Sequence, residues 1–375
     1  MSIARLSVFV YRDPCPVPVA TSFGVMRDRP AVFVRVEAAD GAFGWGEIFA
    51  NWPAAGAEHR ARLLIEDIAP LVLGRPSDAP ETLTAGLTAQ THIRALQCGE
   101  QGPFAQVIAG LDTALCDLCA RRQDKPLAQW LTKDAAQSVP AYASGIAIAD
   151  AAAHIPAARA RGIGWFKLKV GFDMARDIDA LRKLDAARLA HETLCADANQ
   201  AWSHDEARLF VQHAPPLAWL EEPLAVDRPL AEWQSLAQTC ATPLAGGENF
   251  ANTEKFAKVI VQRGLQVIQP DVAKWGGVTG CYAVARQTVS AGLTYCPHFL
   301  GGGIGLLASA HLLAAAQGPG LLELDMNTNL TRAAFFDDDP VVDGRFHLTN
   351  APGLGIENLP AALDPLQTLS VETHL

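Results

Sequence analysis

GIGWFKLK, residues 162–169, is the first of seven apolar segments that each end at a polar residue. The other six are ETLCAD (192–197), LAWLE (217–221), TPLAGGE (242–248), LQVIQPD (265–271), LTYCPH (293–298) and GPGLLE (318–323). Their polar ends follow one another at intervals of 23 to 28 residues, and each segment precedes a stretch of helical composition. One strand, one returning helix and two loops need about that length. The pattern therefore predicts a parallel sheet of repeating βα units that closes into a barrel.

We expect this barrel to occupy residues 131–325. A strand at 139–144 precedes the repeat, which gives eight strands with seven intervening helices, a modified TIM barrel of the form (β/α)7β. The helices are expected near residues 150–161, 174–190, 203–213, 229–238, 252–263, 277–291 and 304–316. Since the carboxyl ends of barrel strands meet at one mouth, the seven polar ends should face one cavity. These are Lys169, Asp197, Glu221, Glu248, Asp271, His298 and Glu323.

The flanking segments predict a smaller α+β unit over residues 1–130. Residues 4–12 and 31–47 alternate as antiparallel strands do, with Asp40-Gly41 as a hairpin turn. Residues 56–73 and 104–121 have helical periodicity. We expect loops near 17–30 and 49–60 to govern substrate specificity, and the C-terminal segment 326–375, with a short strand near 344–350, to pack on the N-terminal unit.

Composition narrows the class of protein. Half of the 375 residues are hydrophobic and 19% are charged, which suits a large core. The net charge of −10, without clustered Lys or Arg, argues against a nucleic-acid partner and against an anionic membrane surface. We find no signal peptide and no stretch of the length of a transmembrane helix. Eight cysteines form no framework; Cys116 and Cys119 are interpreted as buried helix positions. We expect a cytoplasmic protein that forms a homo-oligomer.

Three acids end consecutive strands of the predicted barrel: Asp197, Glu221 and Glu248. Neighbouring parallel strands lie about 4.8 Å apart, so these carboxylates can reach one point. Clustered carboxylates repel unless a cation neutralises them, and an all-oxygen site suits Mg²⁺. The alternative is that some of them only cap the helices that follow. Glu222 competes with Glu221, because strand alternation allows only one of the two to face inward and position alone does not choose.

Basic residues flank this acidic trio on both sides. Lys167 and Lys169 share one face of their strand and should lower each other's pKa, which yields an amine able to accept a proton. On the other side, Asp271 can fix the tautomer of His298. Glu323, at the end of the last strand, could hydrogen-bond a substrate. A substrate carboxylate on Mg²⁺ has an acidified α-proton because the metal stabilises the enediolate. The residues thus favour proton abstraction α to a carboxylate.

Motifs of one known family occur along nearly the whole chain. They are GWGE (44–47), the K-x-K at 167–169, DANQAW (197–202), LEEP (220–223), GGEN (246–249), QPDVAKWGGVTG (269–280), PH (297–298) and PGLGIE (352–357). With these motifs the sequence resembles the mandelate racemase branch of the enolase superfamily, also called the mandelate racemase/muconate lactonizing enzyme family.

The resemblance implies roles that spacing leaves open. It implies Glu221 rather than Glu222 as metal ligand, and Lys169 as the base on one face, with Lys167 modulating it and contacting the substrate carboxylate. The pair of Asp271 and His298 implies that His298 is the second base and that Lys274 is not. Asn199 matches a position near metal and substrate, and Glu323 an acid that binds substrate.

The branch contains acid-sugar dehydratases, racemases and lactone cycloisomerases, which share these residues. We expect a Mg²⁺-dependent hydro-lyase that converts an aldonic or aldaric acid to a 2-keto-3-deoxy acid; the alternative is a racemase, epimerase or lactone cycloisomerase. A non-catalytic binding protein would need a broken site, and every expected acid and base is present. Polar residues of the capping loops could bind a polyol, namely Arg27, Arg29, Asn51, His59, His92 and Arg94.

Overall fold

The computed structural model describes residues 1–21 and 23–375. The N-terminal unit is built on a four-stranded antiparallel sheet in the order β14-β1-β2-β3. Its strands are β1 (Ile3–Thr21), β2 (Gly24–Ala38), β3 (Phe43–Ile48) and β14 (Gln367–His374). The expected hairpin turn at Asp40-Gly41 is confirmed: Gly41 has a φ of 81°, and the Ala38 N–H donates to the Ala42 carbonyl over 2.8 Å.

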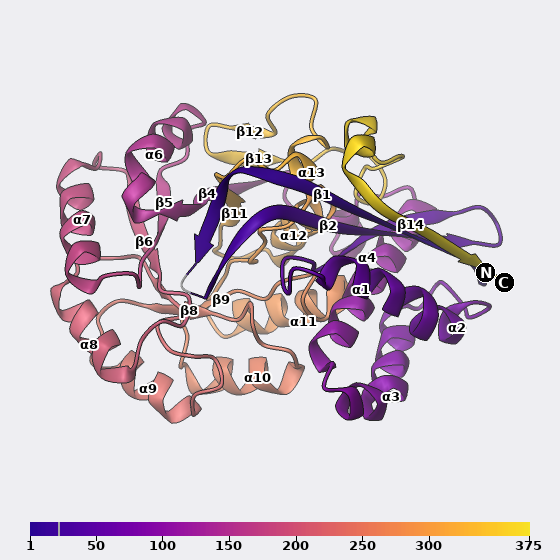
Figure 1. Ribbon diagram of the computed structural model, residues 1–375, viewed down its shortest axis with the longest axis horizontal. Helices are drawn as coiled ribbons and strands as arrows, with labels where there is room; N and C mark the ends of the chain where they lie inside the picture. The colour runs from indigo at the N-terminus through magenta and orange to yellow at the C-terminus, as the bar shows by residue number, and fades with distance from the viewer. Residues whose placement is uncertain (22) are drawn as a thin grey trace.

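The β1–β2 hairpin is longer than the sequence indicated. Residues 17–30 were expected to form a loop, but β1 continues to Thr21 and β2 begins at Gly24, with Ser22 outside the described residues. The expectation failed because Pro14, Pro16 and Pro18 read as loop formers, although proline is tolerated at strand edges and bulges. The ladder is interrupted there, between Pro14 and Val19. In Figure 1 the hairpin extends from the N-terminal unit over the barrel strands.

Helices cover one face of this sheet. They are α1 (Gly56–Leu63), the π-turn η1 (Leu64–Ile68), α2 (Ala69–Val72), α3 (Pro80–Cys98) and α4 (Gln101–Arg122). The helix predicted at 56–73 is therefore present but interrupted by η1. Helix α3 was not anticipated, because Thr84 and Thr91 occupy its buried face beside Leu83 and Leu87 and weaken the apolar periodicity.

Helix α4 is the core of the N-terminal unit. Contrary to the expectation from the sequence, its length and apolar composition would suffice to cross a membrane, but 83% of its most apolar stretch is buried inside the protein. Cys116 and Cys119 lie on it as free thiols with 0% and 6% exposure. The helix therefore behaves as a buried core helix, and the two cysteines as buried helix positions, as predicted.

The predicted (β/α)7β barrel is confirmed. Strands β4 to β10 pair in sequence order and β11 pairs with β4. The Tyr295 N–H on β10 donates to the carbonyl of Pro319, in the segment that leads into β11, over 3.2 Å. The strands are β4 (Ser138–Ala147), β5 (Trp165–Lys169), β6 (Thr193–Asp197), β7 (Leu220–Glu221), β8 (Leu244–Gly246), β9 (Val267–Ile268), β10 (Thr294–Tyr295) and β11 (Leu322–Asp325).

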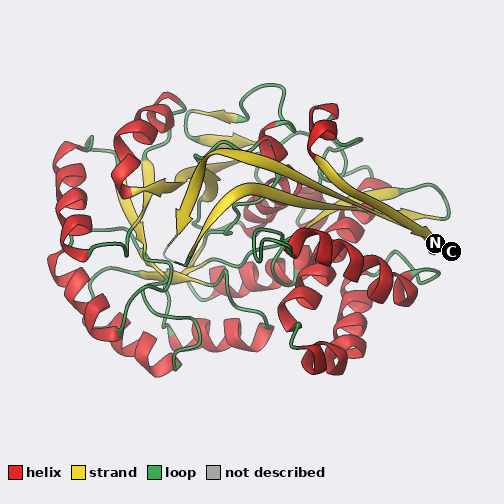
Figure 2. Ribbon diagram, in the orientation of Figure 1, coloured by secondary structure: helices red, strands yellow, loops and turns green. Residues whose placement is uncertain are grey.

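The barrel helices form an outer layer around these strands, as Figure 2 shows. Their bounds lie within a few residues of the expected ranges, because Gly and Pro mark the junctions. They are α6 (Ala151–Ala160), α7 (Met174–Ala187), α8 (His204–His213), α9 (Leu230–Thr239), α10 (Thr253–Gln262), α11 (Gly277–Ser290) and α12 (Gly303–Ala316). The short α5 (Leu127–Leu131) and the 3-10 turn η2 (Ile148–Asp150) precede α6.

An apolar layer fills the barrel beneath its mouth. The layer consists of Tyr142, Cys195, Trp219, Ala245, Val267 and Cys296. The Tyr142 and Trp219 rings meet edge to face, with centroids 5.3 Å apart. Strand side chains alternate between faces, so the residues two positions further along β4 and β6, Ser144 and Asp197, also point inward. Together with Glu221 and His298 they begin a polar layer above the apolar one.

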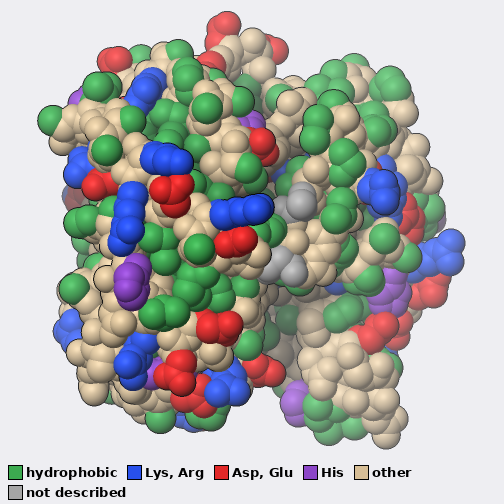
Figure 3. Space-filling model, turned by 60° about the vertical axis from the view of Figure 1, so that its left-hand side comes forward, with side chains coloured by type: hydrophobic (Ala, Val, Ile, Leu, Met, Phe, Trp, Pro, Cys, Tyr) green, Lys and Arg blue, Asp and Glu red, His purple; other side chains and the backbone are tan. Residues whose placement is uncertain are grey.

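The C-terminal segment contacts both units. The hairpin of β12 (Val341–Val342) and β13 (Arg345–His347) adds to the barrel, because β13 pairs antiparallel with the start of β4. After the turn η3 (Ala361–Leu366), β14 pairs with β1. The short helix α13 (Leu330–Ala333) follows β11. On the face seen in Figure 3, Lys and Arg side chains stand beside Asp and Glu rather than gathering into a basic patch.

Candidate active site

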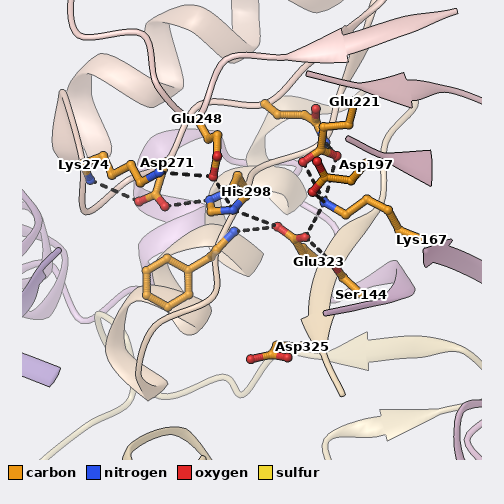
Figure 4. A network of polar contacts seen from close by, with 12 residues as sticks. Ser144, Lys167, Asp197, Glu221, Glu248, Asp271, Lys274, His298, Glu323 and Asp325 are labelled. Carbon is orange, nitrogen blue, oxygen red and sulfur yellow. Dashed lines mark hydrogen bonds and ion pairs between the residues drawn. The ribbon is translucent and has the colours of Figure 1, made fainter. Parts of the chain in front are cut away.

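Side chains from the barrel strand ends meet in one buried polar network (Figure 4). Lys169 lies opposite Asp197 across β5 and β6, and Asp197 lies opposite Glu221 across β6 and β7. The parallel register thus brings residues far apart in sequence to the same level of the barrel. The structure brings together every predicted site residue: Lys167, Lys169, Asp197, Asn199, Glu221, Glu248, Asp271, His298 and Glu323.

Each lysine of the K-x-K pair is held by a carboxylate. Nζ of Lys167 donates to both carboxylate oxygens of Glu221 over 2.8 Å. Nζ of Lys169 lies 2.6 Å from Oδ2 of Asp197 and 2.8 Å from Oδ1 of Asn199. Burial, the largest effect, and the Lys167 ammonium lower the pKa of Lys169, but the carboxylates of Asp197 and Glu221 together outweigh them, and the net pKa is raised. Lys167 does lower the pKa of Lys169, as expected, but the expectation of a lysine with a lowered net pKa is wrong, because each ammonium contacts a carboxylate.

The three candidate metal ligands each face a basic side chain. Asp197 contacts Lys169 and Glu221 contacts Lys167, while Glu248 lies 2.6 Å from Nε2 of His298. Within residues 1–21 and 23–375, no three His, Cys, Asp or Glu side chains are already arranged around one point as metal ligands. A metal would therefore compete with the chain's own ammonium and imidazole groups for these oxygens.

Glu222 is also buried in the network, which corrects the argument from strand alternation. Strand β7 ends at Glu221, and Glu222 has a left-handed φ of 37°, so alternation no longer governs its direction. Both of its oxygens accept from Nδ2 of Asn249 over 3.0 Å, and Asn249 also donates to Glu248. Burial, and then the neighbouring Glu248, raise the pKa of Glu222 well above its ordinary value.

His298 is held from both ring nitrogens. Nδ1 lies 2.8 Å from Oδ2 of Asp271, and Nε2 faces Glu248. Asp271 is itself oriented, because its Oδ1 accepts the Ala273 N–H over 2.8 Å. Burial lowers the pKa of His298, but Glu248 and then Glu323 and Asp271 outweigh it and raise the net pKa well above the ordinary value. The expected contact of Asp271 with His298 is thus present, on strand ends that pair as a parallel bridge.

Glu323 joins the two sides of the network. Its Oε1 accepts from Oγ of Ser144 over 2.6 Å and lies 2.7 Å from Nζ of Lys167. Its Oε2 accepts the Phe299 N–H over 3.0 Å. Burial raises the pKa of Glu323, but Lys167 and His298 outweigh burial and lower it to about 2. This acid therefore stays ionised and connects the lysine side with the histidine side.

Three residues of the network and one residue beside it were given no role from the sequence, or were set aside. Ser144 and Gln269 donate to Glu323 and Glu221, and Lys274 lies 3.2 Å from Oε2 of Glu248. Glu47, from β3, accepts the N–H groups of Gly302 and Gly305 over 2.6 and 2.8 Å at the start of α12. The period-two rule could have found Gln269, which precedes Asp271 by two residues. Glu47 is the last residue of the GWGE motif (44–47), but no local pattern indicates its contact with the start of α12.

The polar residues suggested for the capping loops separate into two groups. Arg29 lines a cavity beside Lys169, and Asn51 lines a narrow one beside Asp271 and His298. His59 pairs with Glu100 and Arg94 with Asp67 on the surface, and Arg27 and His92 are exposed. Arg29 and Asn51 are therefore the two of the six that border the network.

The network holds more acids than bases. With its six carboxyl groups and four basic side chains all ionised, two negative charges remain. The acids are Asp197, Glu221, Glu222, Glu248, Asp271 and Glu323, and the bases are Lys167, Lys169, Lys274 and His298. Burial first, with Asp197 and Glu323 adding to it, raises the pKa of Glu221 to about 7. Beside Glu221, Oε1 of Gln269 is buried without a partner among the described residues. A divalent cation would balance the charge, so the donor set fits a hard metal ion.

Comparison with known proteins identifies the family. Residues 149–362 match the model of the "Enolase C-terminal domain-like" family, and residues 5–132 match "Mandelate racemase / muconate lactonizing enzyme, N-terminal domain". The chain belongs to the mandelate racemase/muconate lactonizing enzyme family of the enolase superfamily. The expected family and fold are thereby confirmed, and the chain is an enzyme.

Members of this family resemble the chain over nearly its full length. A mandelate racemase/muconate lactonizing enzyme from Bordetella bronchiseptica RB50 is 47% identical, with a TM-score of 0.89 over 98% of this chain and 99% of that one. A racemase from Streptomyces coelicolor A3(2) with bound magnesium is 25% identical, with a TM-score of 0.87 over 98% and 100%. Arabinonate dehydratase from Saccharolobus solfataricus is 27% identical over 86% of this chain and 87% of its own length.

Proposed function

We propose that this family member binds Mg²⁺ through Asp197, Glu221 and Glu248 and dehydrates an aldonic or aldaric sugar acid. The observation that carries the proposal is the division of the network. Lys169 and His298, on strand ends at two sides of the mouth, contact different acids of the trio, Asp197 and Glu248. Two proton-carrying groups thus flank the donors. Similarity to a magnesium-bound relative and to a sugar-acid dehydratase supports the metal and the substrate class.

In this proposal Lys169 removes the proton from C2, the carbon next to the substrate carboxylate. Mg²⁺, when bound, supplies positive charge that stabilises the negative charge developing on that carboxylate. Its presence on Asp197 would also weaken that residue's hold on the Lys169 ammonium. Lys167 binds the substrate carboxylate, with Asn199 nearby.

His298 completes the reaction from the other side. Nε2 gives its proton to the departing C3 hydroxyl while Asp271 holds Nδ1. The C2–H and C3–OH bonds break, one water leaves, and the enol formed between C2 and C3 tautomerises to the 2-keto-3-deoxy acid. Glu323 contacts the substrate on the histidine side, next to the Phe299 N–H.

The test is a screen of aldonic and aldaric acids with Mg²⁺ in D₂O. We expect a 2-keto acid from at least one substrate, detected as its semicarbazone, and loss of product in Lys169→Ala and His298→Asn. Exchange of the C2 proton for deuterium without keto acid would contradict dehydration. No exchange with any acid would contradict the proposed chemistry as a whole.

Racemisation or epimerisation is the second candidate, because the same two groups could act on opposite faces of C2. The similarity to the Streptomyces racemase favours it. It predicts deuterium exchange starting from either stereoisomer, with Lys169→Ala losing exchange from one and His298→Asn from the other. Keto-acid formation at a rate exceeding isomerisation would exclude it.

We also propose domain boundaries: residues 1–130 form the capping domain, residues 131–325 form the catalytic barrel, and residues 326–375 contact both. The family matches over 5–132 and 149–362 support this division. Free thiols at all eight cysteines favour a reducing compartment, and we propose the cytoplasm. A trypsin-resistant fragment ending near residue 130 would support the first boundary.

A further inference from the structure

A cavity of 760 Å³ opens beside Lys169, between the β1–β2 hairpin and the barrel mouth. That volume lies within the range of about 300–1,000 Å³ typical of ligand sites. Its wall includes Met26 and Arg29 from β2, Asp325 from the end of β11, and Leu300. Because Lys169 lines the same cavity, a substrate that reacts at Lys169 has room to extend toward Arg29.

Arg29 is a buried cation with unused donors. Its side chain is 2% exposed, and only Nη2 is engaged, donating to Oδ2 of Asp325 over 2.8 Å. Nε and Nη1 have no hydrogen-bond partner among the described residues. Asp13, opposite Arg29 in the β1–β2 ladder, accepts the Leu330 N–H instead. Charged donors that stay buried and unpaired destabilise the fold, so this position calls for an acceptor from elsewhere.

The acceptors next to Arg29 are already taken. Oδ1 of Asp325 accepts from the backbone N–H and Nδ2 of Asn327, over 3.0 and 2.7 Å. Its Oδ2 accepts from Arg29 and from Arg332, the latter over 3.2 Å. Figure 4 shows Asp325 apart from the network around Glu323. A substrate hydroxyl needs an acceptor as well as a donor, whereas an ionised carboxylate only accepts. This end of the cavity therefore suits a carboxylate better than a polyol end.

The backbone keeps Asp325 in this position. Gly145, on β4, has a φ of 69°, and a Cβ there would collide with Oδ1 of Asp325 and Nδ2 of Asn327. Nδ2 of Asn327 in turn donates to the Gly145 carbonyl over 2.8 Å. The Arg29–Asp325 pair is thus built into the barrel wall rather than resting on a loose surface contact.

We propose that Arg29 binds a second carboxylate, at the far end of the substrate, so that the enzyme selects aldaric diacids over aldonic monoacids. This inference rests on the proposed function, because it takes the first carboxylate to lie at the metal ligands. Arg29 is then a specificity-determining residue, and Asp325 holds its guanidinium in position.

The experiment compares six-carbon aldaric and aldonic acids of the same configuration, with wild type, Arg29→Met, Arg29→Lys and Arg27→Met. Arg27 is exposed on the same strand and serves as the matched control. We expect wild type to prefer the diacid by about 100-fold in kcat/KM, the order of a charge-assisted hydrogen bond. Arg29→Met should lose that preference, chiefly through a rise in KM for the diacid that is much larger than any change in KM for the monoacid. Arg29→Lys should keep part of the preference and Arg27→Met all of it.

Equal loss for both acids in Arg29→Met would indicate a structural role and overturn the inference. Should Arg29→Met fail to fold, judged by circular dichroism, the wild-type ratio decides: a preference for the monoacid overturns the inference, and a preference for the diacid upholds it. Deuterium exchange at C2 separates the two proposals. Exchange with monoacids alone would contradict only the role of Arg29, whereas no exchange with either class would overturn both.

Discussion

Nδ1 of His298 lies 2.8 Å from Oδ2 of Asp271, and the two residues pair as a parallel bridge between neighbouring strand ends. The Ala273 N–H holds the other oxygen of Asp271, so the carboxylate cannot turn away without losing a hydrogen bond. A carboxylate in this position keeps a proton on Nδ1 and directs Nε2 toward the mouth.

Asp271→Asn should therefore impair the histidine side alone. We expect kcat to fall about 10–100-fold, the usual effect of losing a partner that orients an imidazole. Deuterium exchange at C2 through Lys169 should remain measurable by NMR. Simultaneous loss of exchange would show that Asp271 acts on the whole site rather than through His298.

Glu221 and Glu222 should differ in metal binding. Glu221→Gln removes a proposed ligand and should weaken Mg²⁺ binding by at least about 100-fold, whereas Glu222→Gln should stay within about tenfold. Isothermal titration calorimetry measures both. The reverse order would assign the ligand position to Glu222, whose oxygens accept from Asn249 here.

Glu47 should make stability depend on pH. Burial outweighs its two backbone hydrogen bonds and raises its pKa to about 7. Between pH 4.5 and 7 the folded state keeps a proton that the unfolded state has lost, so stability falls as pH rises. The loss is about 3 kcal/mol. Glu47→Gln removes this pH dependence. The difference in free energy of unfolding between wild type and variant, measured by urea unfolding, should therefore become smaller from pH 4.5 to pH 7. The exposed Glu81→Gln is the control, with a constant difference.

His311 should make stability depend on pH with the opposite sign, so that stability falls as pH falls. On α12, its Nδ1 accepts the Ala128 N–H over 3.1 Å, and burial lowers its pKa to about 4. Its contribution is present above pH 6.5 and is lost as pH falls toward 4. At pH 5 the loss is about 2 kcal/mol. Urea unfolding of wild type and His311→Gln should show this loss in wild type only, with exposed His92→Gln behaving as wild type. Equal acid sensitivity of His311→Gln would contradict the assignment.

The sequence predicted those parts of the site that depend on repetition. Lys169, Asp197 and Glu221 end apolar runs at even spacing, and parallel register then brings them to one level. What it missed depends on contacts between distant segments. Glu47 reaches the start of α12 across 255 residues, and Arg29 reaches Asp325 across 296. No local period encodes such contacts, because they arise only when the capping unit docks on the barrel.

Charge was harder to predict than position. Two lysines in K-x-K suggested mutual repulsion, but the carboxylates that contact them outweigh it. Strand alternation predicts that only one of Glu221 and Glu222 faces inward, but this rule requires the strand to continue, and β7 ends at Glu221. Both errors came from applying a two-residue rule where six acids and four bases share one buried volume.

The apolar layer beneath the site separates the polar residues from the opposite end of the barrel. Tyr142, Trp219 and Cys296 pack across the barrel beneath the polar residues, and the cavity beside Lys169 lies on the other side, toward the capping hairpin. Under the proposed function, substrate and product would pass through this cavity. Passage of substrate and product through the cavity, rather than bond breaking, can then limit kcat. A substitution in the β1–β2 hairpin would slow product release even where every group that handles a proton is intact.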